Sequence, residues 1–94
     1  NYAKAIEYLS TALHISTREK LLNEKAKSLR LIGSCKEKMG NLNDALNFQQ
    51  QSFAIYGKQN DLLGQAIVNE NIGSIYEDLE LYDKAYFQRD MMHL

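Results

Sequence analysis

The residues of this chain that could carry chemistry are few, and the densest group of them is acidic. Glu77, Asp78, Glu80 and Asp83 stand close together in the sequence, a grouping that could hold a cation or act as an acid–base pair. The segment lacks the loop pattern and the turn glycine of a calcium-binding loop. We therefore interpret it as the charged end of a helix and predict no metal site there.

The other reactive side chains are isolated. His14 and His93 have no partners at the spacing of a metal site, so we expect them on the surface or at the rim of a groove. Ser34 and Ser74 have no nearby histidine and acid to activate a nucleophile. The single cysteine, Cys35, cannot form an internal disulfide and is interpreted as a small apolar side chain. The sequence therefore predicts a protein that is not an enzyme, with no catalytic residues, cofactor or metal.

Charge and hydropathy exclude two classes of binding partner. The net charge is −1 and no apolar run is long enough to span a membrane, so we expect neither nucleic acid nor membrane as a partner. Charge is uneven along the chain. Residues 1–40 carry eight Lys or Arg and four Glu, a net +4, whereas residues 41–94 carry three and eight, a net −5.

The chain repeats itself with a period of 40 residues. Shifting it by 40 gives ten identities in 54 compared positions, where chance gives roughly three. Gly33 and Gly73 are each followed 12 residues later by an alanine, Ala45 and Ala85, and Ala5 stands a further 40 residues before Ala45. A fixed period of this length is typical of a repeat array.

Apolar residues recur at helical spacing throughout, and proline is absent. We predict helices over about 2–20, extending towards 22, then 23–39, then from 43 or 44 to about 56, then 62–79, and from 83 onward. Gly40 should end the second helix, and Asp61 should cap the fourth. We expect Gln49, Gln50 and Gln51 to face water, and Ala66, Ile72, Tyr76 and their helical neighbours to pack.

A glycine inside a helix costs about 1 kcal/mol relative to alanine. Because this cost recurs at Gly33 and Gly73, we expect both glycines to admit close approach of the helix that carries the alanine 12 residues on.

This pattern resembles the tetratricopeptide repeat, whose signature is W-x2-L-G-x2-Y, then A-x3-F, then P. Leu29, Ile32, Gly33 and Lys36 occupy the first four positions in one unit, and Asn69, Ile72, Gly73 and Tyr76 occupy them in the next. Ala5, Ala45 and Ala85 match the alanine. The 40-residue period is similar to that of G-protein-signalling modulators, kinesin light chains and bacterial sensor and regulator proteins of this family.

The resemblance implies an all-α fold, an α-α superhelix of stacked antiparallel hairpins with about five helices. We assign 1–94 to one array: 1–22 as the outer helix of a truncated repeat, 23–61 as a complete repeat, and 62–94 as a repeat truncated in its outer helix. The inner helices, 23–39 and 62–79, would line a concave groove. The side chains that helix geometry turns towards this groove are Lys27, Arg30, Ser34, Lys38, Ile67, Glu70, Asn71, Ser74 and Asp78.

The function expected from this resemblance is a scaffold that binds a peptide or helical segment of another protein in the groove. The alternative is a sensing or self-association segment of a larger signalling or transcription-regulatory protein. Uncovered apolar side chains at the two ends, such as Leu13 and Phe87, favour self-association. A cytoplasmic location is compatible with the single cysteine.

Overall fold

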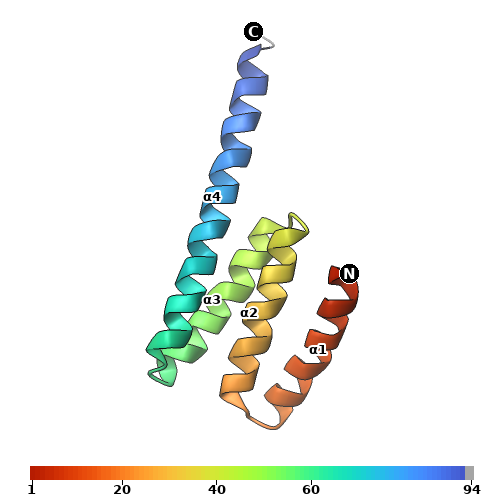
Figure 1. Ribbon diagram of the computed structural model, residues 1–94, viewed down its shortest axis with the longest axis vertical. Coiled ribbons are helices and arrows are strands. Elements are labelled where there is room, and N and C mark those ends of the chain that lie inside the picture. The colour runs from red at the N-terminus through yellow and green to blue at the C-terminus, as the bar shows by residue number, and fades with distance from the viewer. Residues whose placement is uncertain (93–94) are drawn as a thin grey trace.

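The computed structural model describes the backbone of residues 1–92 and the side chains of residues 1–83. It contains four helices in this range, α1 (Tyr2–Arg18), α2 (Leu22–Lys38), α3 (Leu42–Lys58) and α4 (Leu62–Met92). Consecutive helices run antiparallel (Figure 1). The predicted all-α repeat fold is therefore confirmed. The count is four rather than about five, because the segments expected as the fourth and fifth helices form one continuous helix.

Three nearly identical turns separate the helices. A left-handed residue occurs every 20 positions, at Lys20 (φ 58°), Gly40 (φ 85°) and Asn60 (φ 56°). In the second turn the Gly40 N–H donates to the Glu37 carbonyl at 3.0 Å, and the Asn41 N–H donates to the Lys36 carbonyl at 2.9 Å. The same pair of bonds closes the other two turns, which is the Schellman arrangement. The prediction that Gly40 ends a helix is confirmed.

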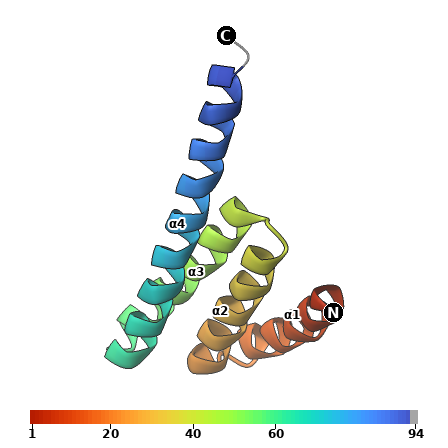
Figure 2. The same cartoon turned by 45° about the horizontal axis from the view of Figure 1, so that its top comes forward.

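The fourth turn that the 20-residue spacing would place at position 80 does not form. Glu80 stands where the earlier turns have Gly40 and Asn60, and a left-handed backbone costs an ordinary residue roughly 1–2 kcal/mol. Lys20 nevertheless adopts this left-handed conformation in the first turn. No glycine or asparagine occurs between Leu79 and Asp83, and α4 continues straight past the rest of the molecule (Figures 1 and 2).

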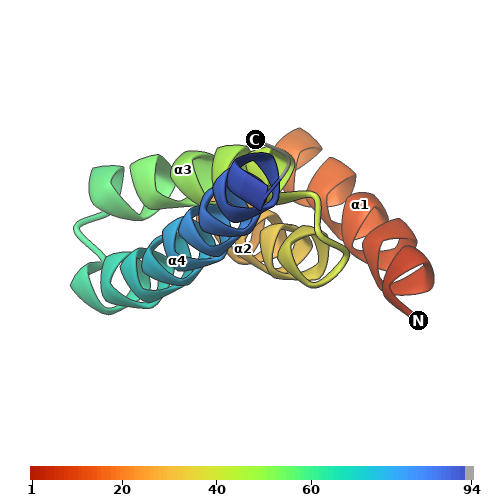
Figure 3. The ribbon, with the colours of Figure 1, turned by 90° about the horizontal axis from the view of Figure 1, so that it is seen from above.

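The helices form two layers. Seen from above, α3 and the end of α1 lie on one side, and α2 and the start of α4 lie on the other, while the rest of α4 crosses over α3 in this view (Figure 3). α2 packs against α1 and α3, α4 packs against α3, and only a small contact joins α2 to α4. Two buried clusters hold the layers together: one contains Ala26, Tyr56 and Val68, and the other contains Leu42, Ala45 and Ile75.

Some predicted boundaries and packing positions need correction. α1 ends at Arg18 instead of extending towards Leu22, and α3 begins at Leu42. Asp61 caps α4 as expected, since its Oδ1 accepts from the Gly64 N–H at 2.8 Å. Two α4 residues expected to pack, Ala66 and Tyr76, are instead exposed.

The expectation for the two repeated glycines is half right. A Cβ on Gly33 would lie 2.7 Å from Nε2 of Gln49 and 3.2 Å from the Ala45 carbonyl oxygen, so α3 approaches α2 closely there. A Cβ on Gly73 would meet nothing within 4 Å. The prediction for Gly73 was wrong because its expected partner segment continues along α4 and does not fold back. The side chain of Ala85 lies outside the described residues.

Candidate functional site

The nine residues predicted to line a groove come from the two helices of one layer, four from α2 and five from α4. Figure 3 shows the start of α4 on the same side of the molecule as α2, and in Figure 1 α3 lies between the two helices. The side chains of Lys27, Lys38, Glu70 and Ser74 are exposed, and the other five are half-buried. The α2 part of this surface is basic, and the α4 part is polar and acidic. We call these nine residues the α2–α4 face.

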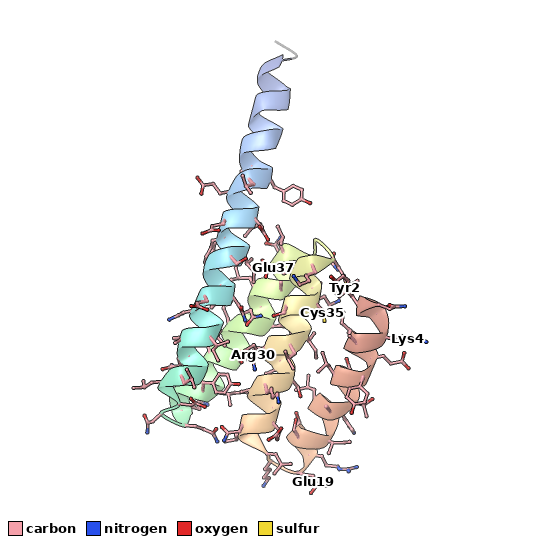
Figure 4. The ribbon with its side chains drawn as sticks, viewed as in Figure 1. Tyr2, Lys4, Glu19, Arg30, Cys35 and Glu37 are labelled. Carbon is pink, nitrogen blue, oxygen red and sulfur yellow. The ribbon has the colours of Figure 1, made fainter. Side chains whose placement is uncertain are left out.

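Arg30 is the most constrained cation of the α2–α4 face (Figure 4). Its Nε is buried and has no hydrogen-bond partner in the described part of the chain. Its carbonyl accepts from Oγ of Ser34 at 3.2 Å and from Nε2 of Gln49 at 2.9 Å. A buried donor without a partner is costly, and because this Nε is covered by the protein itself, an added acceptor could reach it only if the Arg30 side chain moved outward.

A polar network behind this face joins three helices through Gln49. Its amide group donates to the Arg30 carbonyl on α2, and its Oε1 accepts from Nδ2 of Asn71 on α4 at 3.4 Å. One turn away, Oγ of Ser52 donates to the Ala26 carbonyl at 2.7 Å. Gln49 and Ser52 are both fully buried. The prediction that Gln49 faces water was wrong, because its amide is satisfied inside by the α2 backbone.

At the upper end of the face, α2 and α4 are joined by a group of oxygen-bearing side chains. Oγ of Ser74 donates to Oε2 of Glu37 at 2.7 Å, and Glu37 is labelled in Figure 4. Partial burial raises the pKa of Glu37 above its ordinary value. The Ser74 bond opposes this, and the neighbouring Asp78 carboxyl adds to it. Sequence reasoning missed Glu37, because its role depends on which residues of α4 stand opposite.

A pocket of about 410 Å³ opens beside this group. Two of the predicted residues, Lys38 and Asp78, line it. The remaining lining residues were not predicted; they are Glu37, Gly40, Leu42, Leu81 and Tyr82. Leu81 and Tyr82 are each 64% exposed. The pocket thus combines carboxylates, one amine and apolar walls, which suits a side chain with an apolar stem and a polar end.

The other candidate groups do not assemble. Within residues 1–83, no group of three or more potential metal ligands comes together. Glu77, Glu80 and Asp83 are exposed on α4, and His14 is exposed on α1. Cys35 is half-buried, and His93 lies outside the described residues. No helix in the described part of the chain is long and apolar enough to cross a membrane.

Comparison with known proteins agrees with the repeat geometry. The family model described as "Tetratricopeptide repeat" matches residues 1–58, more than half of the chain. This chain therefore belongs to the tetratricopeptide repeat family. Repeats of this family are in general protein–protein interaction modules in non-enzymatic scaffolds.

Two individual proteins are similar. Tetratricopeptide repeat protein 29 of Trypanosoma brucei brucei (strain 927/4 GUTat10.1) is 29% identical over 85 residues. The match covers 90% of this chain but 18% of that protein, so the chain spans less than a fifth of its length. The solution NMR structure of the designed protein DA05 superposes with a TM-score of 0.78 at 18% identity, covering 82% of this chain and 77% of that one. This second similarity concerns the fold alone.

Proposed function

We propose that this chain binds a peptide or helical segment of another protein along the α2–α4 face. The observation that carries the proposal is the row of cations that α2 presents on this face, in which Lys27 and Lys38 are exposed and Arg30 between them is half-buried. The exposed amines of Lys27 and Lys38 can donate to carboxylates or carbonyls of a ligand. The opposite wall, formed by Glu70, Asp78 and neighbouring residues of α4, offers acceptors instead of donors.

The change of charge across this face sets the expected ligand. Lys27, Arg30 and Lys38 favour an acidic stretch beside α2, whereas Glu70 and Asp78 disfavour it beside α4. A ligand with acidic residues on one side and basic or polar residues on the other satisfies both walls. Such a mixed ligand would also be oriented by the face, because its reversal would place like charges together.

The test is a selection of peptides from a random displayed library, followed by affinity measurement on charge variants. We expect the selected peptides to combine an acidic stretch with basic or polar residues. The double variant Lys27→Glu, Lys38→Glu should weaken their binding by roughly 1–2 kcal/mol. The matched control, Lys4→Glu with Lys58→Glu, makes the same change of net charge at exposed positions on α1 and α3. Equal weakening by both variants would contradict binding at the α2–α4 face.

The alternative function, self-association within a larger protein, also has a supporting observation. The α4 residues Leu62, Tyr76 and Leu81 are 76%, 53% and 64% exposed, and exposed apolar groups of this size promote association.

A further inference from the structure

The pocket beside Glu37 lies where α4 passes the turn between α2 and α3. Leu42 follows that turn, and Leu81 and Tyr82 belong to the part of α4 that continues past the expected fourth turn. A Cβ on Gly40 would lie 4.0 Å from Oη of Tyr82, so this side chain reaches across to the turn. Leu81 and Tyr82 are nonetheless largely exposed. The pocket therefore has an apolar wall that is open to a ligand.

Two carboxylates from different helices line this pocket together. Glu37 comes from α2 and Asp78 from α4. Burial raises the pKa of Glu37, the bond from Ser74 opposes the rise, and Asp78 adds to it through a hydrogen bond and its like charge. Within residues 1–83, neither carboxylate forms an ion pair with Lys38, the cation among the lining residues. A further cation between the two carboxylates would therefore be favoured.

The surroundings of the pocket also favour a cation over an anion. The pocket lining contains two carboxylates and one amine, so it carries more negative than positive charge. The side chains of α4 that the structure describes include five carboxylates and no Lys or Arg. Charge complementarity therefore selects a basic group as the occupant.

An arginine side chain matches both the charge and the apolar wall. Its stem can lie on leucine side chains while its planar guanidinium donates to two carboxylates at once. The guanidinium can also stack on the ring of Tyr82. A lysine brings a single point charge and lacks this planar fork. The volume of about 410 Å³ is near the lower end of the roughly 300–1,000 Å³ of ligand pockets, which suits one long side chain.

We propose that this pocket receives an arginine side chain of the protein segment that binds the α2–α4 face, with its guanidinium between the carboxylates of Glu37 and Asp78. The proposal rests on the peptide-binding function proposed above and adds the anchor residue of the ligand. Lys27 stands ten residues before Glu37 on α2, which is about 15 Å along the helix axis. An extended ligand covers this distance with about five residues. The ligand should therefore carry an acidic residue about five positions from the arginine.

The first test needs no peptide ligand. The 94-residue chain is titrated with N-acetylarginine amide at millimolar concentrations, and its backbone amides are followed by two-dimensional NMR. We expect the largest shifts at Gly40, Leu81 and Tyr82. N-acetylcitrulline amide has nearly the same shape without the charge and should shift these amides much less. Equal shifts with both compounds, or no shift at these three amides, would overturn the proposal.

Charge and wall variants separate binding in the pocket from general attraction to α4. Asp78→Asn should weaken arginine binding roughly tenfold or more, because a charged hydrogen bond is lost. Glu77→Gln removes the same charge one residue away, at an exposed position outside the pocket, and should weaken binding no more than about twofold. Tyr82→Ala removes part of the wall without changing the charge and should weaken binding roughly threefold. Equal effects of Asp78→Asn and Glu77→Gln would contradict the pocket.

Circular dichroism checks that these variants keep their helices. Asp78 is half-buried, and Glu77 and Tyr82 are exposed, so all three substitutions should retain the helical content of the parent chain. If one of them unfolds the chain, the comparison of arginine with citrulline on the unaltered chain still decides for or against the pocket.

Peptide selection then distinguishes this proposal from the proposed function. Peptides from the displayed library should contain arginine, and Asp78→Asn should weaken them. Peptides that are weakened by Lys27→Glu but not by the control Lys4→Glu, and that lack arginine, would contradict the arginine pocket alone. Arginine binding in the pocket, with no peptide weakened by Lys27→Glu, would contradict peptide binding along the α2–α4 face and support the pocket as an arginine site.

Discussion

The helices α2 and α4 carry related sequences in different surroundings. Ile32 and Gly33 of α2 correspond to Ile72 and Gly73 of α4. α2 has a neighbouring helix on two sides, α1 and α3, whereas α4 packs mainly on α3. The environment of a repeat residue therefore depends on the next helix along the chain as well as on its own type. A repeated motif predicts an inner helix, but it does not predict whether that helix is covered.

The largest expected difference between the two helices is at the paired isoleucines. Ile32 is 2% exposed, while Ile72 is only partly buried. Replacing Ile32 by Ala should reduce the free energy of unfolding by about 2–5 kcal/mol because the cavity is enclosed. The matched change Ile72→Ala should cost about 1 kcal/mol. Urea denaturation of both variants measures the difference, and equal losses would show that α4 is covered as fully as α2.

Removing the Gln49 amide, which joins the three helices, should have the next largest effect on the free energy of unfolding. Gln49→Ala leaves the Asn71 amide without its partner and removes one of two side-chain donors from the Arg30 carbonyl, which keeps Oγ of Ser34. We expect a loss of about 1–3 kcal/mol. Gln50→Ala removes an exposed side chain from the same helix and should change stability by less than about 0.5 kcal/mol. Similar losses in the two variants would argue against the network.

The paired glycines should respond in opposite directions. Gly33→Ala crowds Gln49 and the Ala45 carbonyl. This overpacking costs about 1–3 kcal/mol, partly offset by about 1 kcal/mol of helix propensity. Gly73→Ala gains the same helix propensity without any crowding, so it should stabilise the chain by about 1 kcal/mol when measured at a dilution where the chain is monomeric. Destabilisation by both changes under those conditions would mean that Gly73 is covered within a single chain.

The smallest expected effect concerns the carboxyl group between the two helices. Because burial raises the pKa of Glu37 in the folded chain, folding favours the protonated form. Stability should therefore fall as pH rises from the ordinary glutamate pKa through the raised one. Glu37→Gln should remove this part of the pH dependence in thermal unfolding. Ser74→Ala removes a bond that lowers the pKa and should move the fall to higher pH; a profile unchanged in both variants would refute the coupling.

Much of the fold followed from local signals, because those signals act within a single helix or turn. The 40-residue period, the turn at Gly40 and the cap at Asp61 could all be recognised in the sequence. The burial of Gln49 could not, since its polarity predicts water when the α2 carbonyl that satisfies it is unknown. Gly64 was also missed: a Cβ there would lie 2.5 Å from the Tyr56 ring, a contact between helices that no spacing within α4 reveals.

The candidate site was predictable only in outline. Helix periodicity selected the side of α2 and α4 that faces away from their apolar stripe, and the structure places the nine residues on two helices of one layer. Helix periodicity did not select Glu37, Leu42 or Tyr82, which line the pocket with Lys38 and Asp78. Those residues meet through the turn at Gly40 and through the continuation of α4, and both depend on tertiary arrangement.

The slight contact between α2 and α4 has a mechanical consequence. These helices are held at their spacing chiefly by α3, and few direct contacts resist their separation. A force that pulls α1 and α4 apart would therefore be resisted mainly by the packing of α3 and by the cluster in which Ala26 of α2 and Val68 of α4 meet Tyr56. Small changes in the distance between α2 and α4 should therefore be reversible, and the packing of α3 should provide most of the resistance to them.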